Sequence, residues 1–321
     1  MIKGSREESG EALKRHQEER NEAFRRHQEE RDIKELDRLE GNISPHDYRT
    51  FLENVGKEHC AETGKWVFSD PLFRSWLSAG SNEAKQRLLW LAGAPGAGNP
   101  SLTIGRVIIE HYIGKTFLCY SILQYLQENI AQADKSIYVL YTFSTHDDIG
   151  GNTAAAIIRS LLYQLCRANR SLVPALYKER DARQSHSFPL NTCGKLLETF
   201  ICGLEPIYII LDGLDECGEV ERNQLLRTIL GIWRNCPNLH VLVASRKKGD
   251  IRRALETNCK TLIVGKQNCI DIKRFVTREI NSLWRKISHI AEPTAGEFLK
   301  TVAHNIVNQS EGTCLYIETM S

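Results

Sequence analysis

Apolar positions follow two rhythms in the middle of the chain, between residues 87 and 264. Five short runs are apolar and rich in β-branched or aromatic residues, which is typical of buried strands. Between them, apolar residues recur every three or four positions, which is typical of helices. The predicted strands are 87–93, 137–143, 207–211, 239–244 and 261–264, and the predicted helices are 115–130, 153–167, 195–202 and 220–233. This alternation predicts an α/β fold, with a parallel sheet covered by helices on both faces.

The N-terminal part has a different pattern, because it is dense in charge. The sequence RHQEER at residues 15–20 recurs at residues 26–31, and Leu13 and Phe24 share the same eleven-residue period. Eleven residues are close to three helical turns, so both copies fall on one face of a helix. Two interpretations stay open: a coiled-coil arm for self-association or a protein partner, and a solvated helix laced with salt bridges. Because the apolar positions are few, we favour the solvated helix.

These patterns divide the chain into four parts. We expect a charged helical arm (1–58), a lead-in segment (59–86), an α/β core (87–266) and a helical extension (267–321) with helices at 270–283 and 294–307. In the lead-in segment, Trp66, Phe73 and Trp76 are predicted to anchor the chain to the core.

Composition narrows the class of protein. The 321 residues are 41% apolar, enough for a substantial core, and the net charge of +2 gives no attraction to nucleic acid or membranes. The first residues lack the apolar stretch of a signal peptide, and no run is long enough to span a bilayer, so we expect a cytoplasmic protein. The ten cysteines show no C-x-x-C spacing. They are therefore predicted to be small core residues rather than a zinc or disulfide framework.

The strand at 87–93 leads into a phosphate-binding loop that is cut in two. Residues 93–98 read GAPGAG, but the Gly-Lys-Thr that should follow appears only at 114–116. Removal of residues 99–114, sixteen in all, leaves GAPGAGKT, a complete loop. Such a loop binds phosphate because consecutive backbone N–H groups lead into a helix N-terminus. Gly93, Gly96, Gly98, Lys115 and Thr116 are therefore candidate nucleotide-binding residues.

A second candidate element follows the strand at 207–211. The sequence LDGLDEC (211–217) places Asp212 at the strand end, where a carboxylate supports Mg²⁺ beside a phosphate loop. Asp215 and Glu216 are placed to orient or deprotonate an attacking water. Arg246, at the end of the strand beginning at residue 239, is placed to reach a terminal phosphate.

Together these residues resemble the NACHT family, within the signal-transducing STAND class of P-loop ATPases related to AAA+ proteins. The nephrocystin-like NACHT proteins of filamentous fungi are the most similar. The resemblance runs from about residue 59 to residue 321 and includes Thr63-Gly64, Trp66, the split GAPGAG…KT loop, LDGLDEC, Ala244-Ser245-Arg246 and residues 269–276. One departure is that Lys247 and Lys248 follow Arg246 where many members have proline.

The resemblance implies a nucleotide-dependent switch that binds ATP or GTP with Mg²⁺ and hydrolyses it slowly, in innate immunity or programmed cell death. It assigns phosphate binding to Lys115, Mg²⁺ binding to Thr116 and Asp212, and catalysis to Asp215, Glu216 and Arg246. Family members add an N-terminal effector and C-terminal repeats, so we expect this chain to be a fragment or a reduced form. The alternative function is a non-catalytic interaction scaffold.

Three interpretations of residues 99–114 decide between these functions. The insert could be real and abolish most nucleotide affinity, because it interrupts the phosphate-binding loop. Residues 107–113 could instead extend the following helix backward and let the loop bulge out. Finally, the insert could be an intron read as protein, which we favour. The codons of Gly98-Asn99 can contain GTAA, those of Ile113-Gly114 can contain TAG before G, and sixteen codons keep the frame.

The intron hypothesis makes a direct prediction about the message. The mature transcript is expected to lack the sixteen codons and to join the codons for GAPGAG to those for Lys115-Thr116. Sequencing of complementary DNA across this junction checks it. A mature message that retains the codons would refute the hypothesis.

Overall fold

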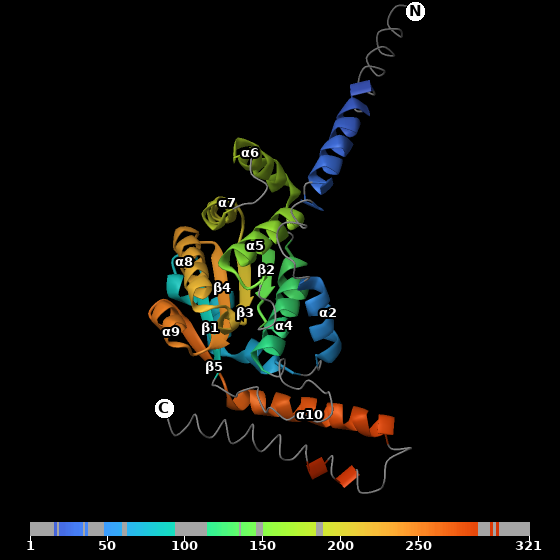
Figure 1. Cartoon of the computed structure of the whole chain (residues 1–321), viewed down its shortest axis with the longest axis vertical. Helices are drawn as coiled ribbons and strands as arrows, with labels where there is room; N and C mark the ends of the chain where they lie inside the picture. The colour runs from blue at the N-terminus through green and yellow to red at the C-terminus, as the bar shows by residue number, and fades with distance from the viewer. Residues whose placement is uncertain are drawn as a thin grey trace, which may run out of the picture.

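A five-stranded parallel sheet forms the centre of the protein (Figure 1), as seen in a computed structural model. The structure describes residues 16–17, 19–34, 36–37, 48–59, 63–93, 114–134, 136–145, 150–183, 189–287, 296–297 and 300–301. The strands are β1 (Leu88–Gly93), β2 (Tyr138–Phe143), β3 (Ile207–Asp212), β4 (Leu239–Arg246) and β5 (Lys260–Val264). They lie in the order β2-β3-β4-β1-β5, and every pairing is parallel. The predicted fold class is confirmed.

Alternate residues of each strand point to opposite faces of the sheet, and both faces are buried. In β1, Leu88 and Trp90 face one apolar cluster, whereas Leu89 and Leu91 face the other. The first face is covered by α5 (Ala154–Ala168), α7 (Leu190–Cys202), α8 (Glu219–Asn235) and α9 (Gly249–Leu255). The second face is covered by α3 (Pro71–Leu77) and α4 (Lys115–Tyr125), with α2 (Tyr48–Glu58) beside α4. This double burial is why the strands read as unbroken apolar runs.

The predicted strands are confirmed to within two residues at each end, but several helices differ. α4 continues as a π-helical turn at Leu126–Ala131, α6 (Val173–Arg183) was not predicted, and α10 runs from Lys266 to Ile287. α7 begins at Leu190 rather than at residue 195. Its first turns include Gly194, a poor helix former, but a methyl group there would lie 3.1 Å from Thr228 of α8. Close contact between the two helices therefore stabilises a turn that propensity does not indicate.

One prediction about the cysteines is wrong, because Cys202 and Cys236 form a disulfide. The two residues end α7 and follow α8, are 34 residues apart in sequence, and have Cα atoms 4.9 Å apart. The pairing arises because neighbouring helices end side by side, which local spacing does not reveal. Five other cysteines are buried free thiols, as predicted: Cys119, Cys166, Cys193, Cys217 and Cys259.

The lead-in segment is anchored to the second face of the sheet by its aromatic residues, as predicted. Asp70 caps α3 by accepting hydrogen bonds from the backbone N–H groups of Leu72 and Phe73. Phe73 and Trp76 are almost fully buried, and the indole N–H of Trp76 donates to the carbonyl of Val241 at 3.1 Å. This segment therefore covers part of the second face of the sheet, beside β4.

The N-terminal arm is helical throughout its described part, between residues 16 and 37, and projects away from the α/β core (Figure 1). Leu36 is buried within the first apolar cluster and fixes the base of the arm. Arg26 pairs with Glu22 at 3.3 Å, as the i,i+4 spacing predicts. Phe24 and Ile33 are exposed, with Phe24 at 72%. These two apolar side chains are therefore uncovered on the described arm, and a partner for them stays a prediction.

No helix among the described residues is long and apolar enough to cross a membrane. The predicted helix at 294–307 lies mostly outside the described residues. Within this range only residues 296, 297, 300 and 301 are described, and all four are helical.

Candidate nucleotide site

The carboxyl ends of all five strands meet at one edge of the sheet, and the candidate residues gather there. Gly93 at the end of β1 is level with Arg246 at the end of β4. Phe143 at the end of β2 is level with Asp212 at the end of β3. Crevices at this edge, where the strand order reverses, are the usual ligand sites of parallel α/β proteins.

The described ends of the split loop, Gly93 and Lys115, meet at this edge. Lys115 begins α4, and its side chain lies over Gly93, where a methyl group would come within 2.7 Å of the Lys115 Nζ. Gly96 and Gly98, with the rest of 94–113, lie outside the described residues. The structure thus places Lys115 beside the end of β1 although twenty-one residues (94–114) separate Gly93 from Lys115 in sequence.

The interpretation in which residues 107–113 extend α4 backward lies outside the described residues, except for Gly114 at the junction. Gly114 has φ 147° and ψ −121°, which is neither helical nor favourable for a residue with a side chain. α4 therefore begins at Lys115, and Gly114 is not part of the helix.

Thr116 and Asp212 are joined directly. The Thr116 hydroxyl donates to Asp212 Oδ2 at 2.6 Å, and the thiol of Cys119 contacts Oδ1 at 3.7 Å. Asp212 is buried, and this burial raises its pKa to about 6, although the Thr116 hydrogen bond and the Lys115 charge act in the opposite direction. Burial and the nearby Asp212 raise the pKa of the Cys119 thiol well above its ordinary value, so Cys119 stays a neutral thiol.

This pair fits a magnesium ion. Mg²⁺ prefers oxygen ligands and binds through a few protein oxygens, waters and substrate phosphates. Thr116 and Asp212 present a hydroxyl and a carboxylate to the same point at the sheet edge. A bound ion would also favour the ionised form of Asp212, which burial alone disfavours.

The acidic turn, Leu214–Glu216 with Cys217, follows β3 after a glycine in the left-handed conformation. Gly213 has φ 71°, and a methyl group there would lie 2.2 Å from the carbonyl oxygen of Ser144. Only glycine fits this position without moving the end of β2. The turn thereby directs Asp215 and Glu216 toward the end of β4.

Asp215 and Glu216 occupy different environments. Asp215 is buried, and its Oδ1 accepts from the Arg246 backbone N–H at 2.9 Å while Oδ2 pairs with Arg246 Nε at 3.3 Å. The side chain of Glu216 is 30% exposed, and its nearest approach to Arg246 is 4.0 Å. Of the two acids predicted to act on water, Glu216 is therefore the accessible one.

Three residues of this region were not predicted from the sequence: Arg222 in α8, Lys248 after β4 and Asp250 in α9. Arg222 Nε and Asp250 Oδ2 form a buried ion pair at 2.7 Å. Burial alone would raise the pKa of Asp250, but the hydrogen bond and charge of Arg222 outweigh it and lower the pKa. The sequence gives no signal of the Arg222–Asp250 pair, and it marks Lys248 only because Lys247 and Lys248 follow Arg246 where many family members have proline.

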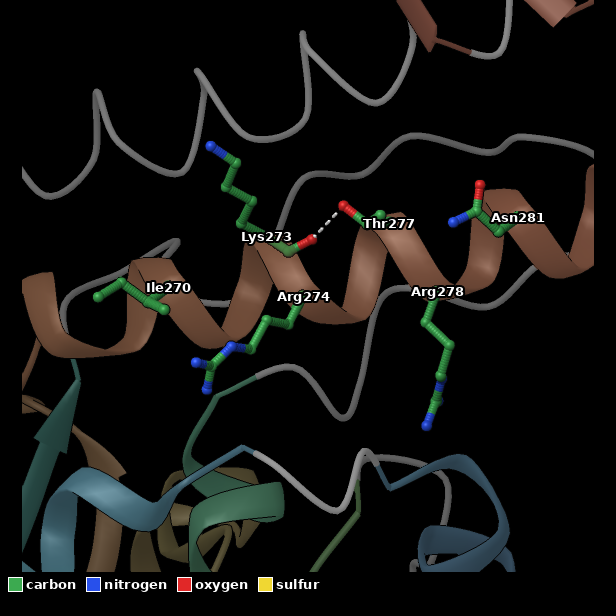
Figure 2. A pocket seen from close by; sticks show the side chains of 6 residues that line it. All are labelled: Ile270, Lys273, Arg274, Thr277, Arg278 and Asn281. Carbon is green, nitrogen blue, oxygen red and sulfur yellow. Dashed lines mark hydrogen bonds between the residues drawn. The ribbon is translucent and has the colours of Figure 1, made fainter.

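A shallow pocket of about 500 Å³ lies elsewhere, along α10 (Figure 2). Its described lining residues all belong to that helix and include the cations Lys273, Arg274 and Arg278. Arg278 donates to the carbonyl of His59 at 2.8 Å, and Asp271 accepts from the Gly64 N–H at 2.8 Å. These bonds attach α10 to the lead-in segment, and none of the described candidate nucleotide-site residues lines the pocket.

The sheet order and the edge residues together define the class of protein. A parallel sheet in the order β2-β3-β4-β1-β5, with Lys115 and Thr116 opening the helix after β1 and Asp212 ending β3, is a P-loop NTPase-like α/β fold.

The chain belongs to the family described as "Nephrocystin 3, N-terminal", whose family model matches more than half of it. The match comes in two pieces, residues 62–112 and 109–246, so its break falls within the stretch that splits the phosphate loop.

Two further similarities are weaker. The chain is 29% identical over 198 residues to "Vegetative incompatibility protein HET-E-1" of Podospora anserina, a match that covers 60% of this chain and 13% of that protein. A solved structure described as "Structure of C. elegans PCH-2" is 14% identical, with a TM-score of 0.30, over 78% of this chain and 52% of that one. This structural similarity is too low to bear on fold or function.

The raised pKa of Asp212 leads to a stability prediction. Because the pKa is about 6 in the folded protein and ordinarily 3.8, the ionised carboxylate destabilises the fold at neutral pH, and stability rises as the pH falls through 6. Asp212→Asn keeps an acceptor for Thr116 without the charge. It should raise the free energy of unfolding at pH 8 by on the order of 2 kcal/mol, and this gain should disappear near pH 4.

Urea unfolding between pH 4 and pH 8 measures the effect, in buffer without Mg²⁺. Glu205→Gln, which removes an exposed carboxylate, is the control and should change stability little. A destabilised Asp212→Asn variant at pH 8, or a gain that does not vary with pH, would contradict the assignment.

Proposed function

We propose that the protein is a nucleotide-dependent switch that binds ATP or GTP with Mg²⁺ at the carboxyl edge of the sheet. The observation that carries the proposal is the meeting of Lys115, Thr116 and Asp212 at that edge despite the interrupted loop. Lys115 and Thr116 begin α4, the helix that follows β1, and Asp212 ends β3. Because these elements are far apart in sequence, the contact depends on the whole fold.

Each residue has a chemical role in this proposal. The Lys115 ammonium would neutralise the β- and γ-phosphates, while Thr116 and Asp212 would hold the ion. Mg²⁺, when bound, would neutralise charge on the phosphate oxygens. Glu216 would orient or deprotonate the attacking water, and Arg246 would contact the terminal phosphate.

The position of Arg246 suits slow hydrolysis. Its side chain is paired with Asp215 and lies 4.0 Å from Glu216, so it is held beside the acids. A terminal phosphate would compete with Asp215 for the guanidinium, because both are anions. Nucleotide binding would therefore couple to a change at the acidic turn, which a switch requires.

The biological setting is also part of the proposal. Family membership and the similarity to a vegetative incompatibility protein support a NACHT-type signalling role in fungal self-recognition, innate immunity or programmed cell death. Because the chain spans 13% of that relative's length, the proposal concerns the nucleotide-binding part alone. We further propose a cytoplasmic location.

A non-catalytic scaffold is the second candidate, because a specific observation favours it. Residues 99–114 interrupt the backbone N–H groups that would wrap the phosphates. In that case the protein would keep the α/β fold and act through the N-terminal arm, whose exposed Phe24 would meet a protein partner or a second copy.

Equilibrium binding of a fluorescent ATP analogue tests the proposal. The full chain and a form without residues 99–114 are titrated with and without Mg²⁺, each beside its Lys115→Met variant. We expect the shortened form to bind in the presence of Mg²⁺. We expect Lys115→Met to weaken binding by about 100-fold or more, since a charged contact to phosphate is lost.

The outcomes separate the two candidates. Binding by both forms supports the switch and shows that the insert is tolerated. Binding only after the deletion supports the switch and assigns the loss to the interruption. Binding by neither form, or binding that Lys115→Met does not weaken, overturns the nucleotide proposal and favours the scaffold.

A further inference from the structure

The acidic turn makes few hydrogen bonds of its own. It is a single turn of 3-10 helix over Leu214–Glu216, closed by the Glu216 N–H donating to the Gly213 carbonyl at 2.8 Å. Helices this short have poor hydrogen-bond geometry and little stability in isolation. The position of Glu216 therefore depends on contacts from outside the turn.

One such contact comes from Lys248, just beyond β4. Its ammonium donates to the backbone carbonyl of Asp215 at 2.6 Å. A charged donor makes a short, strong bond to a carbonyl, and here it holds the main chain directly before Glu216. Lys247, the preceding residue, is also exposed, but no such bond joins it to the turn among the described contacts.

A second contact comes from Arg222, in the first turns of α8. Its Nη1 donates to the backbone carbonyl of Cys217, directly after Glu216. Asp250 fixes the guanidinium by pairing with Nε at 2.7 Å, and both side chains are buried. A buried ion pair with this geometry holds its members in one orientation.

The two contacts hold the backbone of the acidic turn on either side of Glu216, and we call them together the grip. Lys248 and Asp250 lie in the chain that leaves β4, whereas the carbonyls lie after β3, so the grip joins the ends of two adjacent strands. Both contacts reach backbone atoms, so they would act on whatever side chain the turn presents.

We propose that Lys248 and the Arg222–Asp250 pair are positioning residues that hold the backbone of the acidic turn, and with it Glu216, in place beside the end of β4. This inference rests on the proposed function for its catalytic meaning. The grip itself is a property of the nucleotide-free chain and can be measured there.

Hydrogen exchange of the full chain tests the grip. The probes are two backbone N–H groups: that of Glu216, which closes the turn, and that of Arg246, which donates to Asp215. In Lys248→Met both should exchange about tenfold faster or more, because a charged hydrogen bond that restrains local opening is lost. Lys247→Met, the matched control, removes the same charge and should leave both rates unchanged, whereas Lys248→Arg should restore protection.

Asp250→Asn provides an independent second variant, which frees Arg222 and should accelerate exchange at Glu216. If Asp250→Asn fails to fold, Lys248→Met still decides the question. Unchanged exchange in Lys248→Met, or equal acceleration in Lys247→Met, overturns the inference.

Hydrolysis by the form without residues 99–114 gives the second readout. Lys248→Met should lower kcat about tenfold while the nucleotide dissociation constant stays the same, because the turn and not the phosphate contact is disturbed. A raised dissociation constant with unchanged kcat contradicts the positioning role. If no form binds or hydrolyses nucleotide, the proposed function fails, and the exchange experiment still decides whether Lys248 holds the turn.

Discussion

The hydrogen bond between Thr116 and Asp212 is the interaction on which the site depends. It joins the first turn of α4 to the end of β3, and the two residues are 96 positions apart in sequence. Parallel strands make this possible, since their carboxyl ends share one edge and their helices return along the faces. The same bond keeps the second half of the phosphate loop at the sheet edge, although the first half is separated from it by the insert.

Charge balance at the edge explains how the neighbouring residues are arranged. Three acids, Asp212, Asp215 and Glu216, lie close to the cations Lys115, Arg246 and Lys248. Burial raises the pKa of Asp212, although the charge of Lys115 acts in the opposite direction. Asp215 is fully engaged by Arg246, which makes it a structural partner as well as a candidate catalytic acid.

The strands and the candidate residues at their ends could be predicted from the sequence, because the evidence for them is local. Strands buried on both faces are continuous apolar runs, so β1, β3 and β4 are visible, and Asp212 and Arg246 mark their ends. Residues joined by tertiary contact could not be predicted. The Cys202–Cys236 disulfide, the early start of α7 against Thr228, and the grip of Lys248 and Arg222 all depend on which elements become neighbours. In the sequence, the residues that form these contacts have no local pattern that identifies their partners.

The central claim is that phosphates bind against Lys115 at the carboxyl edge of the sheet. Labelling with an ATP acyl phosphate, which transfers an acyl group to a lysine beside the bound phosphates, tests it directly, with modified lysines identified by mass spectrometry. In the form without residues 99–114, we predict modification of Lys115 that excess ATP with Mg²⁺ prevents. Modification confined to exposed lysines such as Lys247 and Lys260, or modification of Lys115 that ATP does not prevent, would contradict the account.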